Sequence, residues 1–259
     1  MNRVKVLETN ILHASDVIFW LDGSSSEDPA TMLRLPAALE LELTTQPSDL
    51  RVVNSAGKTA FLRRPTNPII FGSASEADMQ PPVTPTFPIA GIVSDVSGRY
   101  LSRRFAIAAG NRTGHGLVIY PSPLGSRFGP AGGLLGTLRF NTSGAPAPWA
   151  LLTLTVTTTL GASLTFRGQA NGQGDFILPL NRLPPLPEGI TDYAATLAIS
   201  ALESAVSDSP IDPADLVAMQ LGELAVDAVF SDPISLTLVP GEIRLIRSSS
   251  QNHLAVQPN

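Results

Sequence analysis

Apolar and polar residues alternate along most of the chain, which is the pattern of β-strands that bury one face. The clearest case is LELEL at residues 39–43, where Glu40 and Glu42 mark the water-facing side of a half-buried strand. On this pattern we predict strands at residues 17–21, 39–44, 87–93, 100–107, 117–120, 137–140, 151–158, 164–168, 176–180, 196–202, 234–239 and 242–247. One short helix is predicted after Asp212 and Pro213, because aspartate caps helices well and proline suits the first helical position.

Two turn segments repeat one pattern at a constant separation along the chain. Residues 95–101 read DVSGRYL and residues 171–177 read NGQGDFI. In both, an Asp or Asn that can bond its own turn (Asp95, Asn171) is followed by a glycine, an aromatic and an aliphatic residue in register. The glycines Gly98, Gly172 and Gly174 tolerate positive φ. The Asn-Gly pair at 171–172 predicts a tight hairpin between the strands on either side of it.

The glycines after Asn171 also invite comparison with a phosphate-binding loop, which needs a helix to begin directly after it. Here the following residues are a strand-like stretch with prolines at 179, 184 and 185, which lack the N–H that a helix requires. The segment is therefore predicted to be a turn that binds nothing.

The repeat predicts an all-β protein of two consecutive β-sandwich modules with at most one short helix. The predicted division is a first module at residues 1–120, a Pro/Gly-rich connection at 121–136, a second module at 137–247 and a polar tail at 248–259. Candidate core anchors are Trp20 and Tyr100 in the first module and Trp149 and Phe176 in the second. The apolar residues 254–256 would suit a segment that pairs with a neighbour's sheet edge.

Composition agrees with a folded chain of many short elements. The 21 glycines and 23 prolines among 259 residues exceed the roughly 12% that is typical of proteins. There is no cysteine, which excludes disulfides, thiolate metal sites and cysteine nucleophiles. No stretch reaches the ~18 apolar residues of a membrane helix, and the first twenty residues lack the apolar core of a signal peptide. We therefore expect a protein made and kept in the cytoplasm, or released from it by lysis.

Charge is distributed unevenly along the chain. Residues 1–140 carry 13 Lys and Arg against 11 Asp and Glu, a balance of +2, and residues 141–259 carry 4 against 11, a balance of −7. This balance argues against bulk nucleic-acid binding, which normally needs a concentrated basic face. Halves of unlike sign would favour heterologous contacts between copies or with a partner, while apolar strand edges supply most of the affinity.

A search for catalytic arrangements finds none in the sequence. The three histidines, His13, His115 and His253, are too far apart along the chain for metal-ligand spacing, and no G-x-S-x-G elbow occurs. The aspartates at 208, 212 and 215 lack the spacing of a calcium loop. The pairs at 63–64 and 103–104, all arginine, are most simply solvated charges. The sequence therefore predicts no catalytic residue, no cofactor, no metal and no enzyme activity.

The repeated turns, each followed by an aromatic and an aliphatic residue, and the APAPWA segment at 145–150 resemble carboxypeptidase-regulatory-like modules, which are small transthyretin-like or Ig-like β-sandwiches without catalytic residues. Residues 17–22 (VIFWLD), 94–105 (SDVSGRYLSRRF) and 168–174 (GQANGQG) are similar to chains of phage-tail-like contractile injection system gene clusters. The resemblance spans most of residues 15–240.

This resemblance implies a non-catalytic structural component of a contractile tail, at the cap end or the baseplate periphery. Its partners would be other tail-particle subunits, with a homo-oligomeric ring as one arrangement, and it would assemble in the cytoplasm. The alternative, from a different class, is a carbohydrate- or surface-binding module of a tail fibre or adhesin. That alternative requires an exposed row of aromatic residues, for which Tyr100, Tyr120 and Tyr193 are the candidates.

Overall fold

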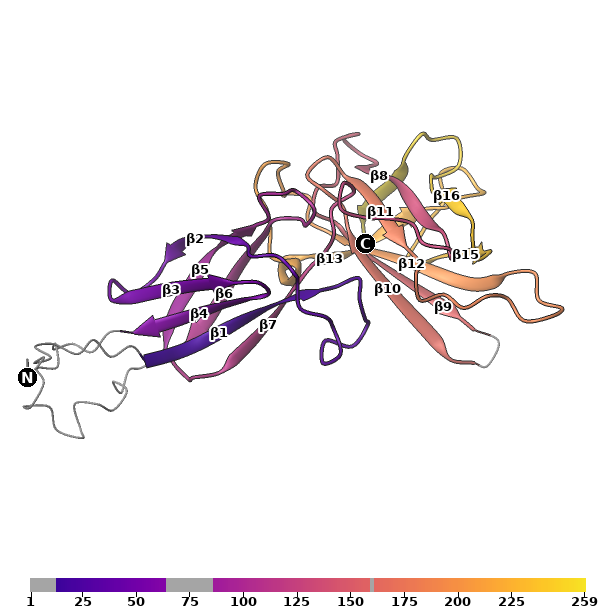
Figure 1. Cartoon of the computed structure of the whole chain (residues 1–259). Coiled ribbons are helices and arrows are strands. Elements are labelled where there is room, and N and C mark those ends of the chain that lie inside the picture. The colour runs from indigo at the N-terminus through magenta and orange to yellow at the C-terminus, as the bar shows by residue number, and fades with distance from the viewer. Residues whose placement is uncertain (1–12, 64–85, 159–160) are drawn as a thin grey trace, which may run out of the picture.

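The computed structural model describes residues 13–63, 86–158 and 161–259, and in these residues the chain is all-β (Figure 1). The predicted all-β class is confirmed. Strands between residues 13 and 119 form two sheets at one end of the molecule, and strands from residue 133 onward form a larger network at the other end. We refer to these two parts as the N-terminal and C-terminal halves.

The N-terminal half packs a four-stranded sheet against a three-stranded sheet. Its strands are β1 (His13–Asp22), β2 (Glu40–Thr45), β3 (Leu50–Ser55), β4 (Lys58–Arg63), β5 (Phe87–Ser94), β6 (Arg103–Ala109) and β7 (Gly114–Ile119). The sheet orders are β3-β4-β1-β7, in which β1 and β7 run parallel, and β2-β5-β6. Trp20 lies between the sheets, where its ring meets Phe105 edge to face and its Nε1 donates to Thr59 Oγ1 at 3.0 Å.

The C-terminal half is one strand network that folds around its own core. Its elements are β8 (Gly133–Phe140), β9 (Leu151–Thr157), β10 (Ser163–Gln169), β11 (Asp175–Pro179), β12 (Tyr193–Ala201), the 3-10 turn η2 (Pro213–Asp215), β13 (Val217–Gly222), β14 (Phe230–Ser231), β15 (Ile234–Leu238), β16 (Ile243–Leu245) and β17 (Leu254–Pro258). The main path is β10-β9-β12-β13-β17-β8-β11, with β14, β15 and β16 attached at its sides. The inner faces enclose one apolar cluster that includes Leu138, Leu152 and Phe176.

A third, smaller cluster joins the two halves. Leu101 and Tyr120 from the N-terminal half pack there with Trp149 and Ile211 from the C-terminal half. Ile211 belongs to the connection between β12 and β13, whose 3-10 turn is capped by Asp212, as predicted from the sequence. Burial raises the pKa of the Tyr120 phenol in this contact, although neighbouring arginines oppose the shift.

Three sequence predictions about this architecture are wrong. Residues 254–256 do not wait for a neighbour's sheet edge, because β17 already lies between β8 and β13 of the same chain and these residues are at most 1% exposed. The predicted connection at 121–136 ends early, because β8 already begins at Gly133. The strands beside Asn171 do not form a hairpin, because β10 pairs with β9 and β11 pairs with β8. For residues 254–256 and for the strands beside Asn171, strands distant in the sequence supply the hydrogen bonds. The prediction had assigned these bonds to another molecule and to the adjacent strand, respectively.

Candidate functional site

The turn at Asp95 has the self-bonded geometry that the sequence suggests. One carboxylate oxygen accepts from the Ser97 N–H at 2.9 Å, and the other accepts from the N–H groups of Arg99 and Tyr100 at 3.1 and 3.2 Å. Gly98 closes the turn on the Asp95 carbonyl with φ of +68°. The Ser97 hydroxyl also donates to the carboxylate, at 2.7 and 2.8 Å. Burial raises the pKa of Asp95, but the hydrogen bond from this hydroxyl and those from the backbone outweigh it and leave the pKa below its usual value.

The turn at Asn171 repeats that geometry. The side-chain oxygen accepts from the N–H groups of Gln173 and Asp175 at 2.8 and 2.9 Å. Gly174 donates to the Asn171 carbonyl at 3.0 Å with φ of +80°, whereas Gly172 does not have positive φ. Both turns are thus built from their own side chains and glycines, and neither precedes a helix that could face a phosphate.

The four candidate core anchors occupy different places. Trp20 and Phe176 are 1% and 2% exposed inside the N-terminal and C-terminal clusters. Tyr100 is half-buried at the edge of the N-terminal cluster, where burial first and Asp22 second raise the pKa of its phenol. Trp149 lies in the contact between the halves, with its Nε1 donating to the Val206 carbonyl at 2.9 Å.

One group of polar side chains superficially resembles a hydrolase triad. The buried Asp16 carboxylate accepts from the Gly110 N–H at 2.6 Å and lies 3.2 Å from both His115 Nε2 and Thr113 Oγ1. In a triad, the acid and the nucleophile contact opposite nitrogens of the imidazole. Here Thr113 Oγ1 and Asp16 both contact Nε2. The arrangement anchors the connection between β6 and β7 to β1 and does not activate a nucleophile.

Arg103 is not simply a solvated charge, which corrects the sequence prediction, whereas the side chains of Arg104 and its partner Asp215 are half exposed. Arg103 pairs with Asp212 at 2.8 Å and Arg104 with Asp215 at 3.2 Å. The side chains of Arg103 and Asp212 are 12% and 20% exposed, so this ion pair is part of the contact between the halves. Sequence spacing could not reveal it, because more than a hundred residues separate the partners. Arg64 lies outside the described residues.

Arginine side chains cap three strands that lie at sheet edges. Arg103 donates to the Val118 carbonyl of β7 at 2.7 Å, Arg244 donates to the Thr237 carbonyl of β15 at 2.9 Å, and Arg182 donates to the Thr165 carbonyl of β10. The Thr165 N–H is occupied as well, because it donates to the Glu27 carboxylate at 2.7 Å. Occupied edge groups cannot pair with another strand. On each of these three strands at least one edge group is therefore unavailable to another strand.

The outer face of β10, β9, β12 and β15 is broad and nearly uncharged, and we call it the hydroxyl face. Strand register places Thr165, Thr155, Thr196 and Ser235 in one row across the four strands. The neighbouring rows are Ser163, Thr157, Ala194 and Thr237, and Arg167, Thr153 and Ala198. A shallow hollow of about 370 Å³ lies over residues of β9, β12 and β15 on this side. Of these eleven residues only Arg167 is charged, within the half of the chain that carries most of the excess acid.

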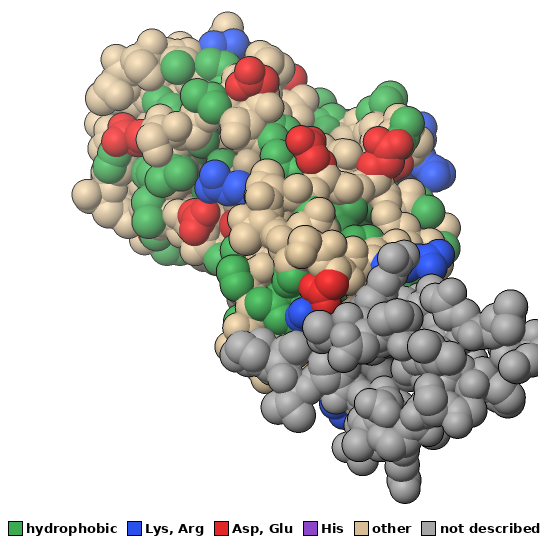
Figure 2. All heavy atoms as spheres, turned by 90° about the vertical axis from the view of Figure 1, so that its left-hand side faces the viewer, with side chains coloured by type: hydrophobic (Ala, Val, Ile, Leu, Met, Phe, Trp, Pro, Cys, Tyr) green, Lys and Arg blue, Asp and Glu red, His purple; other side chains and the backbone are tan. Residues whose placement is uncertain are grey.

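The N-terminal end of the molecule has a different surface. Figure 2 looks onto the left-hand side of Figure 1, and on its visible part acidic and basic side chains are scattered among uncharged ones without a basic patch. Glu40 and Glu42 point to water from β2, as predicted. Across the described residues, no group of three or more His, Cys, Asp or Glu is placed to hold a metal ion, and no helix is long and apolar enough to cross a membrane.

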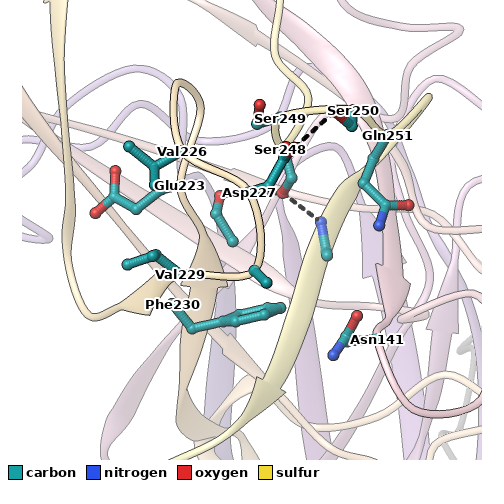
Figure 3. Close-up of a pocket in the computed structure, with 13 residues that line it drawn as sticks. Asn141, Glu223, Val226, Asp227, Val229, Phe230, Ser248, Ser249, Ser250 and Gln251 are labelled. Carbon is teal, nitrogen blue, oxygen red and sulfur yellow. Dashed lines mark hydrogen bonds between the residues drawn. The ribbon is translucent and has the colours of Figure 1, made fainter.

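A second hollow, of about 270 Å³, lies between the β13–β14 connection and the segment before β17 (Figure 3). Phe230, half-buried on β14, forms one side, with Val226 and Val229 nearby and Asn141 across from the ring. Hydrogen bonds from serine side chains at 249 and 250 hold the pKa of Asp227 below its usual value. This hollow was not predictable from the sequence, because its walls come from three distant segments.

The tyrosines proposed as a ligand-binding row do not form one. Tyr120 and Tyr193 are 5% and 2% exposed, and the Tyr193 hydroxyl donates to the Pro185 carbonyl at 3.0 Å. No protein-family model, curated protein or solved structure matches the chain.

Proposed function

We propose that the chain is a non-catalytic structural subunit of a protein assembly, and on the sequence resemblance, a component of a phage-tail-like contractile injection particle. The observation that carries the proposal is the hydroxyl face. A sheet face of small, uncharged side chains can lie close against another surface without desolvating charges. A solvated face would more often carry Lys and Glu.

The capped edges support docking through a face. Arg182 and Arg244 occupy carbonyl groups on the two strands that border the hydroxyl face, β10 and β15. Strand addition at these positions would have to displace an arginine, whereas contact through the face disturbs no internal hydrogen bond. The face spans four strands at about 4.8 Å spacing and a few residues along each, so it is smaller than the roughly 800 Å² per partner of a stable pair. We therefore expect weak association of the isolated chain and stable incorporation where several contacts act together.

Thr196 lies at the centre of the hydroxyl face, so substitutions at this position test the proposal. Thr196→Glu and Thr196→Lys each place a charge on the face, and both should weaken co-sedimentation with assembled tail particles by about tenfold, equivalent to about 1.4 kcal/mol. Thr45→Glu and Thr45→Lys, at an exposed end of β2, are the matched controls and should not change it.

The two charges at position 196 distinguish burial from long-range electrostatics. If net charge alone governs association, Glu and Lys will act in opposite directions. A chain that does not sediment with the particles under any salt condition contradicts the assembly role. A chain that sediments normally with either charge at position 196 contradicts only the hydroxyl face as its contact.

A further inference from the structure

We propose that the hollow beside Phe230 is a binding site for a neutral sugar ring or a polyol of that size. This inference goes beyond the assembly role and holds independently of it. It rests on the side chains that surround the hollow, on its charge and on its size.

The hollow combines an aromatic ring with groups that serve hydroxyls. Phe230 presents its ring toward Asn141, while Gln251 stands on the side of β17 (Figure 3). Asn141 and Gln251 carry amides that both donate and accept, and Ser249 adds a hydroxyl. Sugar rings have apolar C–H faces that pack on aromatic rings and an equatorial rim of hydroxyls that need both donors and acceptors. The lining matches these two requirements together.

Charge restricts the ligand further. Glu223 and Asp227 line the hollow, and no Lys or Arg is among the described residues that do so. The half-buried Glu223 carboxylate accepts from the Ser231 hydroxyl at 2.6 Å. Asp227 accepts from the Ser250 hydroxyl at 3.1 Å but is exposed, so its carboxylate is the charged acceptor nearest to solvent. An ionised carboxylate with no basic neighbour in the lining repels phosphates, nucleotides and sugar acids. It accepts hydrogen bonds from a neutral polyol well.

The walls are held in a defined shape. Ala228 and Ser250, which face the hollow from opposite loops, have φ of +57° and +58°, a left-handed conformation that non-glycine residues keep only where the surrounding structure holds them in it. The Ser250 hydroxyl donates to Asp227 at 3.1 Å and joins the two loops. Ser248, buried behind them, donates to the Gly222 carbonyl and accepts from the Ala255 N–H, both at 3.0 Å. The hollow therefore exists before any ligand arrives.

The volume of the hollow and its single aromatic side chain limit the ligand to one sugar ring. A volume of about 270 Å³ lies just below the range of small-molecule sites, which begins near 300 Å³. With one aromatic contact and an open mouth, the dissociation constant is expected to be about millimolar. The site thus differs from the extended aromatic row that a glycan-chain adhesin requires.

The test is saturation-transfer NMR on the full chain with the methyl glycosides of glucose, galactose, mannose and N-acetylglucosamine. At least one should show saturation transfer, with a dissociation constant of about millimolar. Glucuronate should show none, because the Asp227 carboxylate repels it. Phe230→Leu, which keeps apolar bulk but removes the flat ring, should weaken binding at least about fivefold, as loss of an aromatic contact of about 1 kcal/mol requires.

Control variants keep the result interpretable. Asn141→Ala, at an exposed position after β8, should also weaken binding, and it tests the site if Phe230→Leu does not fold. Val217→Ala, exposed on β13 and outside the hollow, should leave binding unchanged. The proposal is overturned if none of the neutral glycosides shows saturation transfer at a ligand concentration about ten times the expected millimolar dissociation constant. It is also overturned if glucosamine binds while the neutral sugars do not.

Discussion

The turn at residues 95–98 is exposed and joins two strands that pair with each other, β5 and β6. The turn at residues 171–174 is largely buried and joins β10 and β11, which lie at the two ends of the C-terminal network and do not pair. Both have the same side-chain acceptor, the same glycine three residues later and the same left-handed φ at that glycine. The comparison shows that local chemistry specifies a turn, while its surroundings decide what the turn supports.

The surroundings differ most at the shared glycine. A Cβ at Gly98 would meet only the Leu124 side chain, at 3.7 Å. A Cβ at Gly174 would lie 2.4 Å from the Leu138 carbonyl oxygen, which belongs to the backbone of β8. The Leu138 N–H in turn donates to the Gly174 carbonyl at 2.8 Å. The second turn is therefore bonded to and packed against the backbone of β8, close to one end of the network, whereas Gly98 has no such close backbone neighbour.

The largest expected effect is that of Gly174→Ala. Left-handed φ and the clash with backbone each cost roughly 1–3 kcal/mol, so the free energy of unfolding should fall by about 3 kcal/mol or more. Gly98→Ala carries only the cost of its φ and should lower it by about 1 kcal/mol. Urea denaturation of the two variants measures both values. Equal losses would show that the burial difference between the turns has no energetic consequence.

A smaller effect is expected at the second position of each turn, which is residue 96 in the first turn and residue 172 in the second. Gly172 has ordinary φ, but a Cβ there would lie 2.0 Å from the Ser207 carbonyl in the β12–β13 connection. Gly172→Ala should therefore displace this connection, which also holds Asp212 against Arg103, at a cost of roughly 1–3 kcal/mol. Faster proteolytic cleavage within residues 202–212 should report the displacement.

The matched control for Gly172→Ala is Val96→Ala, at the equivalent position of the first turn. Val96 is 75% exposed, so this change should alter neither stability nor cleavage. If Gly172→Ala leaves cleavage of the connection unchanged, the second turn does not support the contact between the halves.

The turns also show how far the sequence could predict this molecule. Asx bonding and left-handed glycine were predictable at Asp95 and Asn171, because both depend on residues within one turn. The partners of the flanking strands were not, because β8 and β9 are supplied by distant segments. The strands at Leu50–Ser55, Lys58–Arg63, Val217–Gly222 and Leu254–Pro258 were missed as well, since polar residues or glycine interrupt their alternation.

The surfaces were predictable only in part. The water-facing glutamates of β2 follow from alternation alone. The hydroxyl face needs the register of four strands, and the hollow beside Phe230 needs three segments that the sequence gives no reason to place together. The arginine caps were hidden for the same reason, because an exposed charge and an edge cap look alike in a sequence.

The smallest expected effect concerns the first residue of each turn, which carries a carboxylate at position 95 and a neutral amide at position 171. Hydrogen bonds depress the pKa of Asp95 in the folded state, so the ionised side chain stabilises the fold above the unfolded-state value of 3.8, and this contribution is lost as the pH falls through the lower folded-state pKa.

Asp95→Asn should remove that dependence and make the first turn behave like the second. Because the turn is exposed, we expect a difference at neutral pH of at most about 1 kcal/mol. Denaturation curves of both proteins, measured from about pH 5 downward, detect the effect as an acid-dependent loss of stability in the parent that Asp95→Asn does not share. The reciprocal variant, Asn171→Asp, should acquire acid sensitivity that the parent lacks at that site. Parallel pH profiles for Asp95→Asn and the parent would mean that the two turns are equivalent in charge as well as in geometry.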